Sequence, residues 1–170
     1  MFKTVITSFI FIYCFISILK AEDISGFWMT INKKTNNPSS VIAVYPYEGK
    51  YYGRIIATYN KEGVINDTIY SPKDRAPGIE GTPYYSGLDI VFDAIPSSNE
   101  RCKGYIVDPT KGKVYRAELW KKGNDLILRG KVFVFGRNEI WPPFPEKNFN
   151  DSFKKPDLTT FIPKIPQVID

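Results

Sequence analysis

The sequence contains no histidine, and this absence removes several kinds of chemistry at once. Histidine is the usual general base, the commonest metal ligand and the side chain whose charge changes near neutral pH. A serine or cysteine nucleophile activated by histidine cannot be built from this chain, and the usual zinc sites lack their ligands. We therefore predict a protein with no catalytic residue, no metal site and no cofactor.

Cysteine is nearly absent as well. Of the two cysteines, Cys14 lies in an apolar N-terminal segment and Cys102 stands alone in the rest of the chain. No disulfide within the mature protein is possible, so its stability has to come from packing. A lone thiol in an oxidising compartment can be buried, pair with another chain or react, and burial is the favoured alternative.

A strong charge of one sign is also missing. Of 23 basic side chains, Lys3 and Lys20 fall in the N-terminal segment, so 21 remain against 18 acidic ones, a net charge of +3. The basic residues stand mostly in apparent turns, where charge normally serves solubility. A nucleic-acid partner is therefore not expected.

The first 21 residues have the pattern of a secretory signal peptide. Lys3 precedes an apolar run that ends at Leu19, and Ala21 is a small residue at the expected cleavage site. The run is shorter than the roughly 20 residues that span a bilayer. We expect cleavage near Ala21 and an exported protein, either periplasmic or secreted, with a retained N-terminal anchor as the alternative.

No window of helical length shows an apolar stripe with a 3.6-residue period. Short runs rich in Val, Ile, Tyr and Phe instead alternate with turn clusters, which predicts antiparallel β structure. The expected strands cover residues 26–32, 40–47, 51–59, 88–94, 104–107, 113–121, 125–135 and 138–141. Gly or Asn stands at the expected turns in 47–50, 108–112 and 122–124, where a positive φ closes a hairpin.

Hairpins between strands adjacent in sequence predict an up-and-down meander. A lone sheet of this length leaves unpaired edges and an uncovered apolar face, and closure into a small barrel satisfies both. The predicted fold class is therefore all-β, a small antiparallel up-and-down β-barrel. Several strands are apolar or aromatic on both faces, so the periodicity does not decide which face points inward.

Two segments break the strand pattern. Residues 61–87 are punctuated by Gly and Pro but hold several tyrosines, which favours an ordered loop over one mouth of the barrel. Residues 143–170 form a proline-rich apolar extension that we expect to lie on the barrel or to engage a protein partner. The predicted organisation is a signal peptide over 1–21, a barrel domain over 22–142 and this extension.

Five fragments carry a resemblance to a known family. They are Gly26-Phe27-Trp28, the stretches 44–55, 104–115 and 126–130, and Gly136-Arg137 followed by Trp141. In this order and spacing they resemble the secreted bacterial family called domain of unknown function 2147, over residues 24–141. The resemblance implies an exported bacterial protein with a lipocalin-like barrel. The chain departs from the family pattern in residues 100–103, at Pro142 and in the tail after Pro143.

Trp28 resembles the tryptophan that plugs the base of a lipocalin barrel. A guanidinium from a late strand stacks on such a ring, and Arg129 or Arg137 would supply it here. These three residues are therefore predicted to have a structural role at the barrel base.

Binding of a small apolar or amphipathic molecule in the barrel is the first functional hypothesis. Arg54 lies in the middle of a predicted strand and needs solvent or a counter-ion, such as Glu118 or a ligand carboxylate. Aromatic residues at alternating positions usually fill a core, so each candidate has a structural alternative. The predicted ligand-binding residues are Tyr45, Arg54, Tyr70, Tyr85, Tyr115, Glu118 and Trp141.

Two other hypotheses remain open. A hydrolase could use paired carboxylates, either Asp89 with Asp93 or Asp67 with Asp74, although the spacing of Asp89 and Asp93 predicts that they face solvent. Alternatively, the barrel is filled by its own side chains, and the tail or the long loop docks a protein partner in the cell envelope.

Overall fold

The fold is all-β in the computed structural model, which describes residues 22–97, 99–132 and 135–169. One sheet contains every strand of the described chain, in the order β1-β2-β3-β5-β6-β7-β8-β9, with β4 paired to β3 outside this path. The strands are β1 (Gly26–Ile31), β2 (Pro38–Tyr47), β3 (Lys50–Tyr59), β4 (Ile65–Thr68), β5 (Asp89–Pro96), β6 (Cys102–Asp108), β7 (Lys113–Lys122), β8 (Asp125–Val132) and β9 (Phe135–Trp141).

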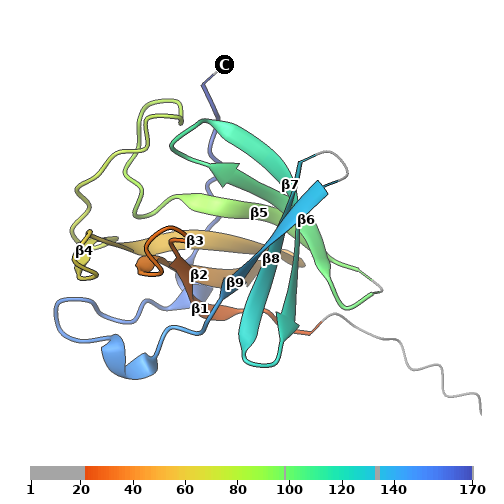
Figure 1. Ribbon diagram of the computed structural model, residues 1–170, viewed down its shortest axis with the longest axis horizontal. Helices are drawn as coiled ribbons and strands as arrows, with labels where there is room; N and C mark the ends of the chain where they lie inside the picture. Colours follow the sequence, from red (N-terminus) through yellow and green to blue (C-terminus); the bar gives the residue numbers. More distant parts are fainter. Residues whose placement is uncertain (1–21, 98, 133–134, 170) are drawn as a thin grey trace, which may run out of the picture.

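Each strand of the main path pairs antiparallel with its neighbour, as the predicted meander requires (Figure 1). The β2–β3 turn has positive φ at both central residues, 46° at Glu48 and 77° at Gly49. This is the mirror-image turn whose twist matches that of paired strands. Gly112 and Gly123 also have positive φ in the turns before and after β7, so the predicted hairpins are confirmed.

The segment that follows β9 closes the barrel against β1. Met29 N–H donates to the carbonyl of Pro142 at 2.8 Å, and Phe144 N–H donates to the carbonyl of Phe27 at 2.8 Å. An edge strand left without partners exposes backbone groups that invite aggregation. These two bonds give β1 partners on its second side and complete the ring.

The inward face can be identified from the strand register. Ile42 pairs with Ile55 and Val44 with Gly53, and Gly53 in turn pairs with Val91. Trp28, opposite Ile42 on β1, lies on the same face and is only 5% exposed. On the other side of the ring, the same face carries buried side chains from β6 to β9, namely Cys102, Ala117, Leu119, Leu126, Leu128 and Trp141. Two tryptophans and a set of aliphatic side chains therefore fill the interior.

The long loop before β5 is ordered, and part of it is a strand that the sequence did not reveal. β4 contains a single strongly apolar residue, Ile65, so it shows no alternation, and it is held by its pairing with residues 57–59 of β3. Further along, Ala76 and Ile79 are buried in the main core. Gly78 N–H donates to the carbonyl of Pro109 at 2.9 Å, which fixes the loop to the turn between β6 and β7.

The C-terminal extension lies on the outer face of β1, β2 and β3. Phe144 and Phe153 are buried against Val41 and Ile56, in a core separate from the barrel interior. The tail contains two short 3₁₀ helices, η1 (Glu146–Asn148) and η2 (Leu158–Thr160). In the part of the chain that the structure describes, no helix has the length and apolar character needed to cross a membrane.

Replacing Trp28 by alanine is expected to destabilise the fold by about 3–5 kcal/mol, because it removes a large buried ring from the interior. Trp120 is partly exposed on the outward side of β7, so Trp120→Ala is expected to cost clearly less. Denaturant unfolding of both variants measures the order. Equal and small losses would show that Trp28 does not fill the barrel.

Gly104 on β6 and Gly130 on β8 offer a matched pair of glycines, on the two strands that flank β7. A Cβ added at Gly104 would lie 2.6 Å from the Cα of Ala94, whereas one at Gly130 would meet nothing within 4 Å. Gly104→Ala is therefore expected to cost about 1–3 kcal/mol of unfolding free energy, the usual range for overpacking. Gly130→Ala should be nearly neutral in the same denaturation experiment, and a reversed order would contradict the close approach of β5 and β6.

Candidate functional site

The predicted ligand-binding residues do not lie in one place. Trp141 is buried in the interior, Tyr45 and Arg54 lie together on the outward face of β2 and β3, and Glu118 lies on the outward face of β7. Tyr70 and Tyr85 belong to the loop before β5, where Tyr70 is exposed and the Tyr85 hydroxyl shares a hydrogen bond with that of Thr110. Tyr115 is partly buried and pairs with Ile106 on β6. Only Tyr45 and Arg54 come into contact.

Tyr45 and Arg54 form a buried polar cluster with Asp89. The Arg54 guanidinium donates through Nε to one carboxylate oxygen of Asp89 at 3.1 Å and through Nη2 to the other at 2.7 Å. The hydroxyl of Tyr45 donates to the first oxygen at 2.9 Å. This two-point contact is the geometry in which an arginine binds a carboxylate most strongly.

The strand register explains why these side chains meet. Arg54 stands opposite Asp89 on β5, so both point outward. The counter-ion expected for Arg54 is present, but it is Asp89 and not Glu118. The prediction that Asp89 faces solvent was wrong, because the carboxylate is fully buried. Burial, followed by the negative charge of Asp89, raises the pKa of Tyr45.

The C-terminal tail covers this cluster. Arg54 Nη2 donates to the carbonyl of Ile162 at 2.7 Å, and Lys164 N–H donates to Asp89 at 2.7 Å. The ring of Phe161 lies 4.5 Å from the guanidinium carbon of Arg54. Because the tail and Tyr45 use the polar atoms of the ion pair, the cluster serves to anchor the tail to the barrel.

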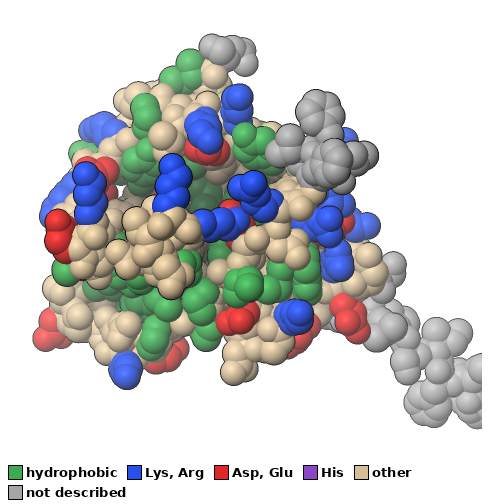
Figure 2. Space-filling view, viewed as in Figure 1, with side chains coloured by type: hydrophobic (Ala, Val, Ile, Leu, Met, Phe, Trp, Pro, Cys, Tyr) green, Lys and Arg blue, Asp and Glu red, His purple; other side chains and the backbone are tan. Residues whose placement is uncertain are grey.

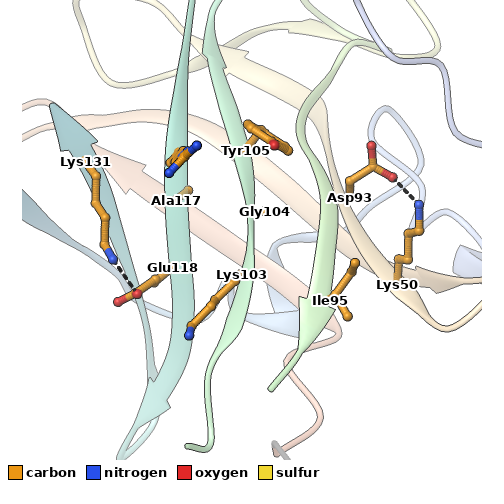
Figure 3. Close-up of a pocket in the computed structure, with 10 residues that line it drawn as sticks. Lys50, Asp93, Ile95, Lys103, Gly104, Tyr105, Ala117, Glu118 and Lys131 are labelled. Carbon is orange, nitrogen blue, oxygen red and sulfur yellow. Dashed lines mark hydrogen bonds and ion pairs between the residues drawn. The ribbon is translucent and has the colours of Figure 1, made fainter. Parts of the chain in front are cut away.

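A second place is open to solvent. A cleft of about 510 Å³ lies on the outward face of the sheet, across β5, β6, β7 and β8 (Figure 3). Apart from Lys50, which reaches over from β3, its walls come from these four strands. The lining residues are Lys50, Asp93, Ile95, Lys103, Gly104, Tyr105, Arg116, Ala117, Glu118 and Lys131.

One wall of the cleft depends on a β-bulge in β5. The register between β5 and β6 shifts between Phe92 and Ile95, and Asp93 in this interval has a φ of 51°. A bulge bends its strand and re-aims a side chain. Asp93 consequently faces Lys50, whose ammonium group lies 2.6 Å from its carboxylate (Figure 3).

The opposite wall is organised by Glu118. Its carboxylate lies 2.5 Å from the ammonium group of Lys131 and 2.9 Å from the guanidinium group of Arg101. The hydrogen bond from Lys131, opposed by partial burial and helped by Arg101, lowers the pKa of Glu118 below its ordinary value. Glu118 therefore stays ionised and fixes two cations beside the cleft.

The residues predicted for the barrel base are not grouped in the structure. Trp28 points inward, and its indole N–H donates to the carbonyl of Ile24 at 3.1 Å. Arg129 stands opposite Glu118 on the outward face of β8, and Arg137 is exposed on β9. Among the described residues, the guanidinium that stacks on a tryptophan is Arg101, 4.2 Å from the ring centre of Trp120.

Of the carboxylates considered for catalysis, those of Asp67, Asp89 and Asp93 are engaged in structural contacts. Asp67 accepts backbone N–H groups of Lys73 and Asp74, which holds the loop after β4. Within residues 22–97, 99–132 and 135–169, no group of three or more acidic or thiol side chains is placed to hold a metal ion. Cys102 is buried, and burial raises the pKa of its thiol to about 11, so the thiol stays protonated at neutral pH.

Asp89→Asn is expected to destabilise the fold by about 3–5 kcal/mol, because it leaves the Arg54 cation buried without its counter-ion. Asp93→Asn is the matched control, since its partner Lys50 is solvated, and it should cost much less. The double change Arg54→Met with Asp89→Leu should recover part of the loss. Thermal or denaturant unfolding gives the order, and equal losses from the two single variants would contradict an anchoring role for Asp89.

The chain is similar to known bacterial proteins in sequence and in fold. A family profile described as an uncharacterised protein conserved in bacteria (DUF2147) matches residues 26–142. None of the curated proteins matches the sequence. Among solved structures, the chain is similar to protein HP1028 from the human pathogen Helicobacter pylori, described as belonging to the lipocalin family. The TM-score is 0.59 and the identity 16%, covering 74% of this chain and 85% of the other. The chain belongs to the DUF2147 family of bacterial proteins, and its barrel is lipocalin-like.

Proposed function

We propose that the protein is an exported, non-catalytic binding protein that holds a small amphipathic molecule. The observation that carries the proposal is the open cleft on the outward face of β5–β8, which combines exposed apolar side chains with charged walls. Ile95 and Tyr105 are 52% and 41% exposed in it. Its volume falls within the usual range of about 300–1,000 Å³ for small-molecule sites.

The filled interior argues for the outer cleft over the inside of the barrel. Lipocalin barrels have an interior wide enough for one small ligand when side chains do not occupy it. Here Trp28 and Trp141 occupy that space together with aliphatic side chains. The likeness to a lipocalin supports a binding role by analogy of fold alone, so the site has to be argued from its own residues.

Export rests on the sequence of the first 21 residues, which lie outside the described part of the structure. Lys3, the apolar run to Leu19 and the small Ala21 support a cleaved leader. The intact mass of protein recovered from the cell envelope would decide between a cleaved leader and a retained anchor.

A docking function is the second candidate, favoured by one specific observation. The tail carries exposed apolar side chains, Ile162, Ile165 and Ile169, although Phe144 and Phe153 of the same tail pack on the barrel. Combined with a filled interior, such a surface suits an envelope protein that binds a protein partner. Concentration-dependent mass in solution would reveal self-association through this surface.

The neutral probe N-phenyl-1-naphthylamine is expected to bind saturably, with a negative heat-capacity change from the burial of apolar surface. Tyr105→Ala should weaken this binding by about 2- to 10-fold, the range expected for loss of one aromatic contact. Tyr70→Ala is the control, because Tyr70 is also exposed but lies on the loop before β5. Fluorescence titration and calorimetry measure both. Absence of binding, or equal effects of the two variants, would contradict a binding site in this cleft.

A further inference from the structure

The cleft on β5–β8 carries an excess of positive charge. Its lining contains four Lys or Arg side chains and two acidic ones. Figure 2 shows a band of Lys and Arg side chains across the middle of one face of the molecule, with apolar side chains exposed below it. Local charge of this kind attracts anions to a cleft.

Both acidic side chains of the cleft are already neutralised. Asp93 pairs with Lys50, and Glu118 pairs with Lys131 and with Arg101 just outside the lining. Lys103 and Arg116 make no salt bridge to another described residue. The positive charge of these two side chains is therefore available to a ligand.

The strand register places two cations directly opposite one another. Arg116 on β7 pairs with Lys131 on β8, and both side chains point outward. Like charges at directly opposed positions of neighbouring strands destabilise the pair. Glu118 lies two residues from Arg116 on the same face of β7. It forms a salt bridge with Lys131, so it compensates the charge of Lys131 and leaves that of Arg116 uncompensated. An anion placed beside Arg116 would compensate that charge as well.

A flat apolar surface lies beside these cations. Tyr105 stands opposite Arg116, on β6, and its ring stacks on that of Phe92 with centroids 5.5 Å apart and planes 18° from parallel. Phe92 is buried, so it fixes the orientation of the more exposed Tyr105 ring. A fixed aromatic ring next to a guanidinium group suits a ligand in which an anionic group is attached to a flat apolar part.

We propose that the cleft binds a small molecule that carries a phosphate-type dianion on a flat apolar group. Arg116 and Lys103 contact the anion, and the Tyr105 ring contacts the apolar part. Lys131, held by Glu118, adds a fixed positive charge at the rim. This assignment rests on the proposed binding function and names the class of its ligand.

The test compares 1-naphthyl phosphate with 1-naphthol, two probes that share the ring and differ in the dianion. Calorimetry with the full mature chain should show the phosphate binding at least about tenfold more tightly, because charge-assisted hydrogen bonds form only with the phosphate. Added salt should reduce this difference. Inorganic phosphate alone should bind weakly, since it lacks the ring.

Two charge-removing variants locate the anion. Arg116→Gln and Lys103→Gln should each weaken 1-naphthyl phosphate by about tenfold, the scale of a hydrogen bond to a charged group, and leave 1-naphthol within about twofold. Lys122→Gln is the matched control, because Lys122 is also exposed on β7 but lies at its far end, outside the cleft lining. The control should bind both probes as the parent protein does.

The other outcomes separate the two levels of the proposal. Equal binding of the two probes, with Tyr105 still required, would overturn the dianion assignment and leave the binding function intact. Failure of both probes to bind would overturn the dianion assignment and count against the binding function. Binding to vesicles of phosphatidic acid without binding of 1-naphthyl phosphate would show that the anion is a lipid headgroup in a membrane, and would overturn the small-molecule ligand.

Discussion

The closure of the strand ring depends on two backbone hydrogen bonds between β1 and the segment after β9. Without them, Phe27 and Met29 would leave one side of β1 unpaired, and the apolar interior would open along that edge. The same segment leads into the aromatic tail, which covers the outward apolar face of β2 and β3. Closure of the barrel and burial of its outer face are therefore consecutive consequences of one stretch of chain.

Closure around two tryptophans leaves an interior filled by side chains, and the proposed binding site therefore lies on the outer surface. The ion pair of Arg54 and Asp89 faces outward but is sealed by residues 161–164. The outward face of β5–β8 lies beyond the tail, and its bulge at Asp93 and the glycine at 104 shape an open cleft. The tail thus covers one outer face of the barrel and leaves another available.

The all-β class, the hairpin order and most strand boundaries could be predicted, because alternation and turn residues are local signals. β4 could not, since a four-residue strand with one strongly apolar side chain shows no alternation. The partner of Arg54 was missed because Asp89 is distant in sequence and meets it only through the β3–β5 register. The cleft depends on a bulge and on cross-strand neighbours, which are likewise properties of the assembled sheet.

The proposed site of recognition is the cleft on the outside of a filled barrel. Nuclear Overhauser effects between protein protons and the ring protons of bound 1-naphthyl phosphate test this site most directly. They report only contacts within about 5–6 Å, a range comparable to the 4.5–7 Å that separates the centres of packed aromatic rings. Binding in the outer cleft predicts contacts to the ring of Tyr105 and none to the methyl groups of Ile42 and Leu128. Contacts to those inward methyl groups would show that the ligand enters the barrel and would contradict binding in the outer cleft.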